Sequence, residues 1–397
     1  MIRNWQDEEE GQSLLARMGC KFLNGHSIYV GSWVLRFPVR LPLFLYVTCA
    51  VGISIKMVLN YDNLVLIIDC AHMMIHMVVG IQTTLICTKQ KGRIMKLKDQ
   101  LDKFDDVPGK EASSTRIKED YELQVMNLYR TFSRCILVTI NIYILFPICK
   151  LFTEAGRAKL SKVLVWQMWL WVPEETWWGF TIIFLFELVT SLFLLLSVMY
   201  AVPYLACLGT ITVAHCKVLI LRLKSLQKRA EERSGKMSES YEAALNYEID
   251  GCARRLHENL RIANEVADVY KYYLSSFYYG GMFALCMSGL QAVAANENIE
   301  ESLKFMGVLT GELVAIGLAT YVSEGIIEGF ADVRASIYDL PWYVYPKLSC
   351  KRLHLMSTMS SFRGLRTMFG YELTLLHFGD VLNASYKYYN LLLLSMK

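Results

Sequence analysis

The sequence predicts an all-α membrane protein in which seven helices cross the bilayer. Three observations support this prediction: the composition, the length of the apolar runs and the distribution of positive charge. Of the 397 residues, 54% are hydrophobic and only 20% are charged, whereas a soluble chain of this length usually carries more charge and fewer long apolar runs. Seven segments also approach the roughly 20 mostly apolar residues that a spanning helix requires.

The predicted spans, in chain order, are 39–59, 64–87, 132–152, 177–214, 266–295, 303–330 and 372–395. The fourth run is longer than a bilayer requires, so we expect it to continue into the cytosol beyond Pro203. The seventh run is more polar than the others. No internal repeat is visible, which argues against a transporter built from inverted halves.

Lys and Arg are concentrated in alternate connections between the spans. The tail before Leu41 has five of them, the connections 88–131 and 214–265 have ten each, and 331–371 has six, against none in 60–63 or 296–302 and three in 153–176. Because cytosolic segments hold the excess of Lys and Arg, the N-terminus is predicted to be cytosolic and the C-terminus extracellular. A G-protein-coupled receptor has the opposite orientation, so the charge pattern argues against that class.

Two basic cytosolic segments, 89–106 and 215–233, have helical spacing and no proline. They are expected to extend the third to sixth helices below the membrane, where they either pack against neighbouring subunits or present a solvated charged face. Residues 107–115 and 234–240 are predicted to be loop tips.

The sequence offers no sign of an enzyme. It lacks a Walker A run, a GxSxG elbow and a dinucleotide fingerprint. The eleven cysteines are scattered without CxxC pairs, and we interpret them as small apolar packing residues. No cofactor and no nucleic-acid partner is expected.

The last predicted span carries a stripe of polar residues at helical spacing. The stripe consists of Asp380, Asn383, Lys387 and Asn390, and the same face continues with Ala384, Leu391 and Leu394. Because polar groups within a bilayer usually face protein or water, this face either lines an aqueous path around a symmetry axis or is buried against other helices. In the first case an apolar ring that includes Leu391 would close the pore by dewetting.

Three motifs at the C-terminal end resemble those of the insect odorant receptor family. The run Ser385-Tyr386-Lys387-Tyr388-Tyr389 resembles the Ser-Tyr-x-Tyr-Phe close of that family. Residues 336–343 (SIYDLPWY) resemble the motif before its seventh helix, and 353–359 (LHLMSTM) resemble the cytosolic half of a split seventh helix. The related gustatory receptors end in a Thr-Tyr-(x5)-Gln-Phe motif that this sequence does not contain.

This resemblance implies an odorant-binding subunit of a heterotetrameric, ligand-gated, non-selective cation channel. The partner would be the odorant co-receptor. The channel would be located in the plasma membrane of olfactory sensory neurons. Residues 1–330 would form the ligand-binding side domain with its cytosolic extensions, and 331–397 the anchor and pore segment. Leu391 and Ser395 match the outer gate positions of the family. A gustatory-type homomer and a metabotropic receptor remain the alternatives.

The resemblance also places the ligand in the outer half of the membrane, among the second, third, fourth and sixth helices. Applied to this sequence, that position selects Asp69, His72, Met73 and His76, then Asn141, Ile144, Leu145 and Ile148, then Phe184, Glu187, Leu188 and Ser191, and finally Phe305, Met306, Leu309 and Thr310. An apolar wall with a few polar groups suits a small, mostly apolar volatile.

The spacing Asp69-x2-His72-x3-His76 puts three potential metal ligands on one helix face. It is the one such cluster that the seven histidines form. Pocket lining or hydrogen bonding between helices is the favoured interpretation, and we predict no metal from the sequence alone.

Overall fold

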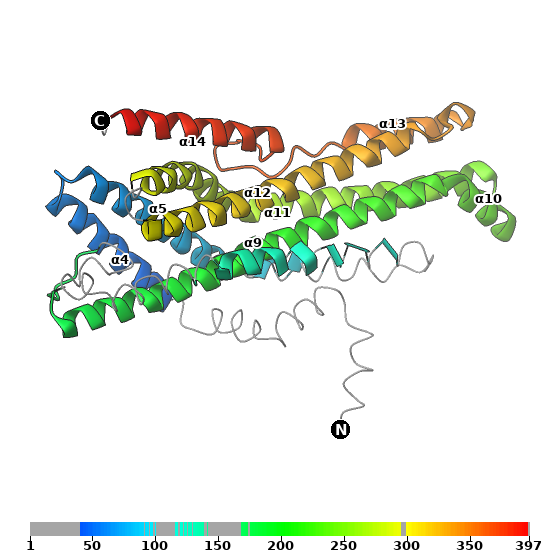
Figure 1. The fold of residues 1–397 in the computed structure, drawn as a ribbon. Helices are drawn as coiled ribbons and strands as arrows, with labels where there is room; N and C mark the ends of the chain where they lie inside the picture. Colours follow the sequence, from blue (N-terminus) through cyan, green and yellow to red (C-terminus); the bar gives the residue numbers. More distant parts are fainter. Residues whose placement is uncertain are drawn as a thin grey trace, which may run out of the picture.

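A computed structural model describes residues 40–90, 168–173, 175–294 and 299–395, together with parts of the stretch 92–141. The described elements are helices α4 (Arg40–Leu59), α5 (Leu64–Lys89), α9 (Trp177–Lys224), α10 (Leu226–Met237), α11 (Tyr241–Ala294) and α12 (Ile299–Tyr338), the short 3-10 helix η2 (Trp342–Val344), and helices α13 (Lys347–Met359) and α14 (Leu375–Ser395). Figure 1 shows α9, α11 and α12 running side by side, with α14 along one edge of the bundle.

The predicted all-helical membrane architecture is confirmed. Within the described residues, α4, α5, α9 and α12 each contain a segment long and apolar enough to cross a membrane. Such segments are helical because lipid offers no hydrogen-bond partner to the backbone. Helices α11 and α14 are less apolar, since tyrosines and polar side chains interrupt them. The third predicted span is helical at 131–138 and at Asn141, and the remainder of it lies outside the described residues.

Three helices are far longer than a bilayer is thick. With 48, 54 and 40 residues and a rise of 1.5 Å per residue, α9, α11 and α12 extend about 72, 81 and 60 Å, against an apolar core of about 30 Å. The predicted helical continuation of 215–233 is confirmed by α9 and α10. The turn predicted at 234–240 is shorter than expected, because α10 continues to Met237 and ends at Ser238, whose φ of 52° is left-handed.

Ion pairs and an apolar core join α10 and α13 to the long helices α9, α11 and α12. Each pair joins two elements: Arg229 to Glu248 between α10 and α11 at 3.2 Å, Lys217 to Asp332 between α9 and α12, and Arg352 to Asp250 between α13 and α11. Partly exposed pairs contribute only about 0–1 kcal/mol each. The buried side chains of Leu245, Leu256 and Leu353 lie between the same helices, so apolar packing supplies most of the stability.

The segment between α13 and α14 is held by hydrogen bonds to the long helices. The backbone N–H of Leu365 donates to Ser323 Oγ at 3.0 Å, and that of Leu375 donates to Glu324 Oε2 at 3.0 Å. Both acceptors belong to α12. The short antiparallel bridge between Arg366 and Glu372 closes the connection. The helical structure therefore ends with α13 and begins again with α14, whose first residue is bonded to α12.

Gly364 is the tightest point of this connection. Its φ is +89°, and a methyl group on its Cα would lie 2.8 Å from Ile327 Cδ1. We predict that Gly364→Ala lowers the free energy of unfolding by about 1–3 kcal/mol from backbone strain alone, with a further loss from the clash. The thermal unfolding midpoint of the purified chain in detergent measures this effect.

Two other glycines serve as matched controls. Gly370 has a φ of +81° but open space around it, so Gly370→Ala should lower the midpoint less than Gly364→Ala does. Gly235 lies in α10 without a close neighbour, so Gly235→Ala should leave the midpoint unchanged or raise it slightly. Equal midpoints for the Gly364 and Gly235 variants would contradict the tight packing of this connection.

Candidate functional site

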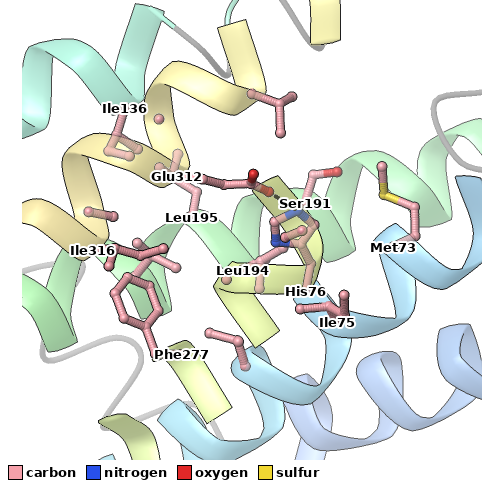
Figure 2. A pocket seen from close by; sticks show the side chains of 17 residues that line it. Met73, Ile75, His76, Ile136, Ser191, Leu194, Leu195, Phe277, Glu312 and Ile316 are labelled. Atoms are coloured by element: carbon pink, nitrogen blue, oxygen red, sulfur yellow. Dashed lines mark ion pairs between the residues drawn. The ribbon is translucent and has the colours of Figure 1, made fainter. Parts of the chain in front are cut away.

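A cavity of about 180 Å³ lies between α5, α9, α11 and α12. Figure 2 shows the side chains that surround it. The lining residues are Met73, Ile75, His76 and Val79 from α5, Ile136 from the helical stretch 130–138, Ser191, Leu194, Leu195 and Val198 from α9, Phe277, Gly281 and Ala284 from α11, and Val308, Gly311, Glu312, Ala315 and Ile316 from α12. Pockets for drug-sized ligands hold about 300–1,000 Å³, so this cavity suits a smaller molecule.

The wall of the cavity is apolar except at three side chains, those of His76, Ser191 and Glu312. His76 and Glu312 face each other across the space between α5 and α12, and Figure 2 marks their ion pair. Small-molecule sites commonly combine an apolar wall with a few polar groups that fix orientation. The arrangement can therefore bind a small, mainly apolar ligand with one polar group.

Behind this wall, polar side chains from three helices satisfy one another. Glu312 Oε1 lies 2.9 Å from His72 Nε2 and 3.3 Å from His76 Nε2, and Ser288 Oγ of α11 donates to Glu312 Oε2 at 3.1 Å. Uncompensated polar groups in a membrane are costly. The cluster of His72, His76, Ser288 and Glu312 therefore fixes the positions of α5, α11 and α12 relative to one another along their axes.

The residues predicted from sequence fall into three groups in the structure. Met73, His76 and Ser191 line the cavity. Asp69 and His72 lie on the same helix and bond to α11 and α12, with Gln291 Nε2 donating to Asp69 Oδ1 at 2.9 Å.

The remaining predicted residues lie elsewhere among the described residues or outside them. Glu187 is buried, Phe184 stacks on Phe180, Leu309 packs against the main core, Leu188 and Phe305 are half-buried, and Asn141, Met306 and Thr310 are exposed. Ile144, Leu145 and Ile148 lie outside the described residues.

Sequence reasoning missed two features of the site. Helix α11 supplies Phe277, Gly281 and Ala284 to the cavity, and nothing in the apolar pattern indicates which neighbour a given face meets. Glu312 was also missed, although a signal was present. It is an acidic residue inside a predicted span, and such residues mark functional positions.

Helix α14 contacts the rest of the chain along a narrow strip. Val381 is buried, and Ser385 Oγ donates to the carbonyl oxygen of Met282 on α11 at 3.0 Å. The predicted stripe lies on the other side: Asp380, Asn383, Lys387, Leu391 and Leu394 are exposed, while Ala384 and Asn390 are half-buried. The side chain of Ser395 lies outside the described part of the chain. In the single chain the stripe is therefore free to face other subunits or water.

Helix α11 touches both the cavity and α14 within the same two turns. Phe277 and Gly281 line the cavity, while the intervening Tyr278 donates from its hydroxyl to the carbonyl oxygen of His377 on α14 at 2.8 Å. One turn further on, the rings of Phe283 and Tyr388 lie 5.9 Å apart. A shift of α11 caused at the cavity would therefore move groups that contact α14.

These features define a multi-pass helical membrane receptor with a small internal cavity beside an amphipathic terminal helix. The family model described as 7tm Odorant receptor matches residues 43–386, and the chain belongs to this insect odorant receptor family. The members of this family are ligand-gated channels rather than enzymes.

Solved structures of insect olfactory receptors have the same fold. The structure of the olfactory receptor OR5 from Machilis hrabei in complex with eugenol is similar with a TM-score of 0.74 at 13% identity, over 89% of this chain and 88% of that one. The structure of OR5 described without a ligand gives a TM-score of 0.68 at 14% identity, over 89% and 87%. At these identities the likeness establishes the fold. No curated protein sequence matches the chain.

Proposed function

We propose that this chain is the odorant-binding subunit of a heteromeric, non-selective cation channel that it forms with the odorant co-receptor. Its place would be the plasma membrane of olfactory sensory neurons, with the N-terminus cytosolic, as the charge distribution indicates. Residues 1–330 would hold the ligand and 331–397 would form the anchor and pore. The observation that carries the proposal is the contact of one helix, α11, with both the cavity and α14.

The cavity is the proposed ligand site. Each buried methylene contributes roughly 0.8 kcal/mol before the costs of binding are subtracted, so a volatile of about ten heavy atoms would bind at micromolar strength. OR5, which shares the fold, is described in complex with eugenol, a small phenolic molecule. His76, Ser191 and Glu312 would orient a polar group of the ligand.

Gating follows from differential affinity. A ligand that fits the cavity better when α11 is displaced outward shifts the population toward that state. Because Tyr278 and Met282 of α11 bond to α14, the displacement withdraws α14 from the central axis of the tetramer. Cations then pass the widened ring at Leu391.

The test of this function is co-expression with the co-receptor and current recording during a screen of volatiles. We expect ligand-evoked cation currents in excised patches only when both chains are present. Currents from this chain alone would indicate a homomeric channel and contradict the need for the co-receptor. Currents that need a soluble second messenger, and vanish on excision, would favour a metabotropic receptor.

A pair of substitutions on α12 tests the cavity. Val308 lines it, while Met306 is 48% exposed and does not. Because overfilling a packed space costs about 1–3 kcal/mol, Val308→Phe should raise the half-maximal ligand concentration by roughly 10-fold or more. Met306→Phe adds the same ring on the outside and should change it by less than about 2-fold. A larger increase in the half-maximal ligand concentration for Met306→Phe than for Val308→Phe would place the ligand outside this cavity.

Opposite charges at one position test the pore face. Leu391 is 65% exposed on α14. Leu391→Glu should raise single-channel cation conductance and Leu391→Lys should lower it, because a ring of side-chain charge attracts or repels permeating cations. Both variants disturb packing to a similar degree, so each controls for the other. Unchanged conductance and rectification in both would show that this face does not line the pore.

A further inference from the structure

The side chains of His72, His76 and Glu312 bring three potential metal ligands together. The two Nε2 atoms lie 3.2 Å apart, and Glu312 Oε1 lies 2.9 Å from the Nε2 of His72 and 3.3 Å from that of His76. The ligands come from two helices, since His72 and His76 are one turn apart on α5 and Glu312 belongs to α12. Among the described residues this is the group of His, Cys, Asp and Glu side chains with the geometry to hold a metal ion.

The spacing of these atoms is close to that around a tetrahedral zinc ion. Zinc binds His nitrogen at about 2.0–2.1 Å and carboxylate oxygen at about 2.0–2.2 Å. Tetrahedral angles then place neighbouring ligand atoms roughly 3.3–3.5 Å apart. The observed triangle has sides of 2.9, 3.2 and 3.3 Å, so movements of a few tenths of an ångström admit the ion.

The close contacts of His72 Nε2 cannot all be hydrogen bonds at the same time. A neutral imidazole Nε2 either donates one hydrogen or accepts at one lone pair. The Nε2 of His72 faces three polar atoms, those of Glu312 at 2.9 Å, Ser288 at 3.1 Å and His76 at 3.2 Å, which is more than its single site serves. A cation at the centre of the triangle engages the lone pairs of His72, His76 and Glu312 together.

We propose that His72, His76 and Glu312 form a Zn²⁺ site in the wall of the cavity. Two histidines and one glutamate are a ligand set of zinc sites that keep the fourth position open. The ion also offsets the charge of a carboxylate placed within the membrane. Ser288, which donates to Glu312 Oε2 at 3.1 Å, supplies the outer hydrogen bond that fixes a ligating carboxylate.

The open position faces the cavity. His72 is fully buried, whereas the side chains of His76 and Glu312 are 27% and 10% exposed and belong to the cavity wall. The fourth ligand is therefore a water or the donor atom of a molecule in the cavity. Only this last step, in which the cavity ligand meets the ion, rests on the proposed function.

Zinc titration of the full-length chain tests the site. The chain is purified without a polyhistidine tag, stripped with a chelator and titrated with Zn²⁺ alone. We expect one tightly bound ion per chain. Loss of an outer hydrogen-bond partner already costs roughly 10–100-fold in affinity, so His76→Gln and Glu312→Gln, which remove ligands, should each weaken binding by about 100-fold or more.

Two matched variants control for the substitutions themselves. Glu328→Gln makes the same change on α12, and His354→Gln makes it on α13, and neither residue belongs to the triangle. Both should bind Zn²⁺ as the unmodified chain does. Equal affinity in the His76 and Glu328 variants, or no stoichiometric binding by the unmodified chain, overturns the site.

X-ray absorption of the zinc-loaded unmodified chain gives a second result that does not depend on variants folding. We expect four light-atom ligands with the scattering of two imidazoles. A shell of six oxygens, or fewer than two imidazoles, contradicts the assignment. Neither measurement needs channel current, so a failed zinc site and a failed odorant response are distinguishable.

Discussion

Helix α11 packs against the cavity, α14 and the polar groups of α5 and α12 within about four turns, and the rest of the structure depends on this constraint. One face closes the cavity through Phe277, Gly281 and Ala284, a second bonds to α14, and its outer end meets α5 and α12 through Ser288 and Gln291. A change in the size of a side chain on any of these faces would displace α11 and so change its contacts on the other faces. Ligand cavity and terminal helix are therefore coupled by ordinary packing, because well-packed interiors transmit displacement instead of absorbing it.

The polar cluster at the outer end of α11 explains how charged residues are tolerated inside an otherwise apolar bundle. Glu312, His72 and Ser288 lie within hydrogen-bond distance of one another, and Asp69 is bonded to Gln291. Each pair joins different helices, so the cost of burying polar groups is offset only when the helices are in register. The cluster thus specifies one relative height for α5, α11 and α12. Two members of the cluster, His76 and Glu312, also belong to the cavity wall.

The sequence predicts the helices well and their partners poorly. Apolar run length sets the boundaries of α4 and α5 to within a few residues, because this property is local to one segment, whereas α12 continues to Tyr338, beyond the predicted end at 330. The polar stripe of α14 is also local to one segment, and most of it is exposed in the single chain. The pairing of His72 with Glu312, 240 positions away, depends on which helix faces meet. Periodicity in one segment carries no information on that, so the contribution of α11 to the cavity had to come from the structure.

The most direct measurement is a cryo-electron microscopy structure of this chain assembled with the odorant co-receptor, with and without an activating volatile. The account predicts ligand density between α5, α9, α11 and α12, in contact with Phe277 and Val308, and α14 at the central axis, further from that axis when the volatile is bound. Density for the volatile at a subunit interface, or α14 facing lipid on the periphery, would contradict it.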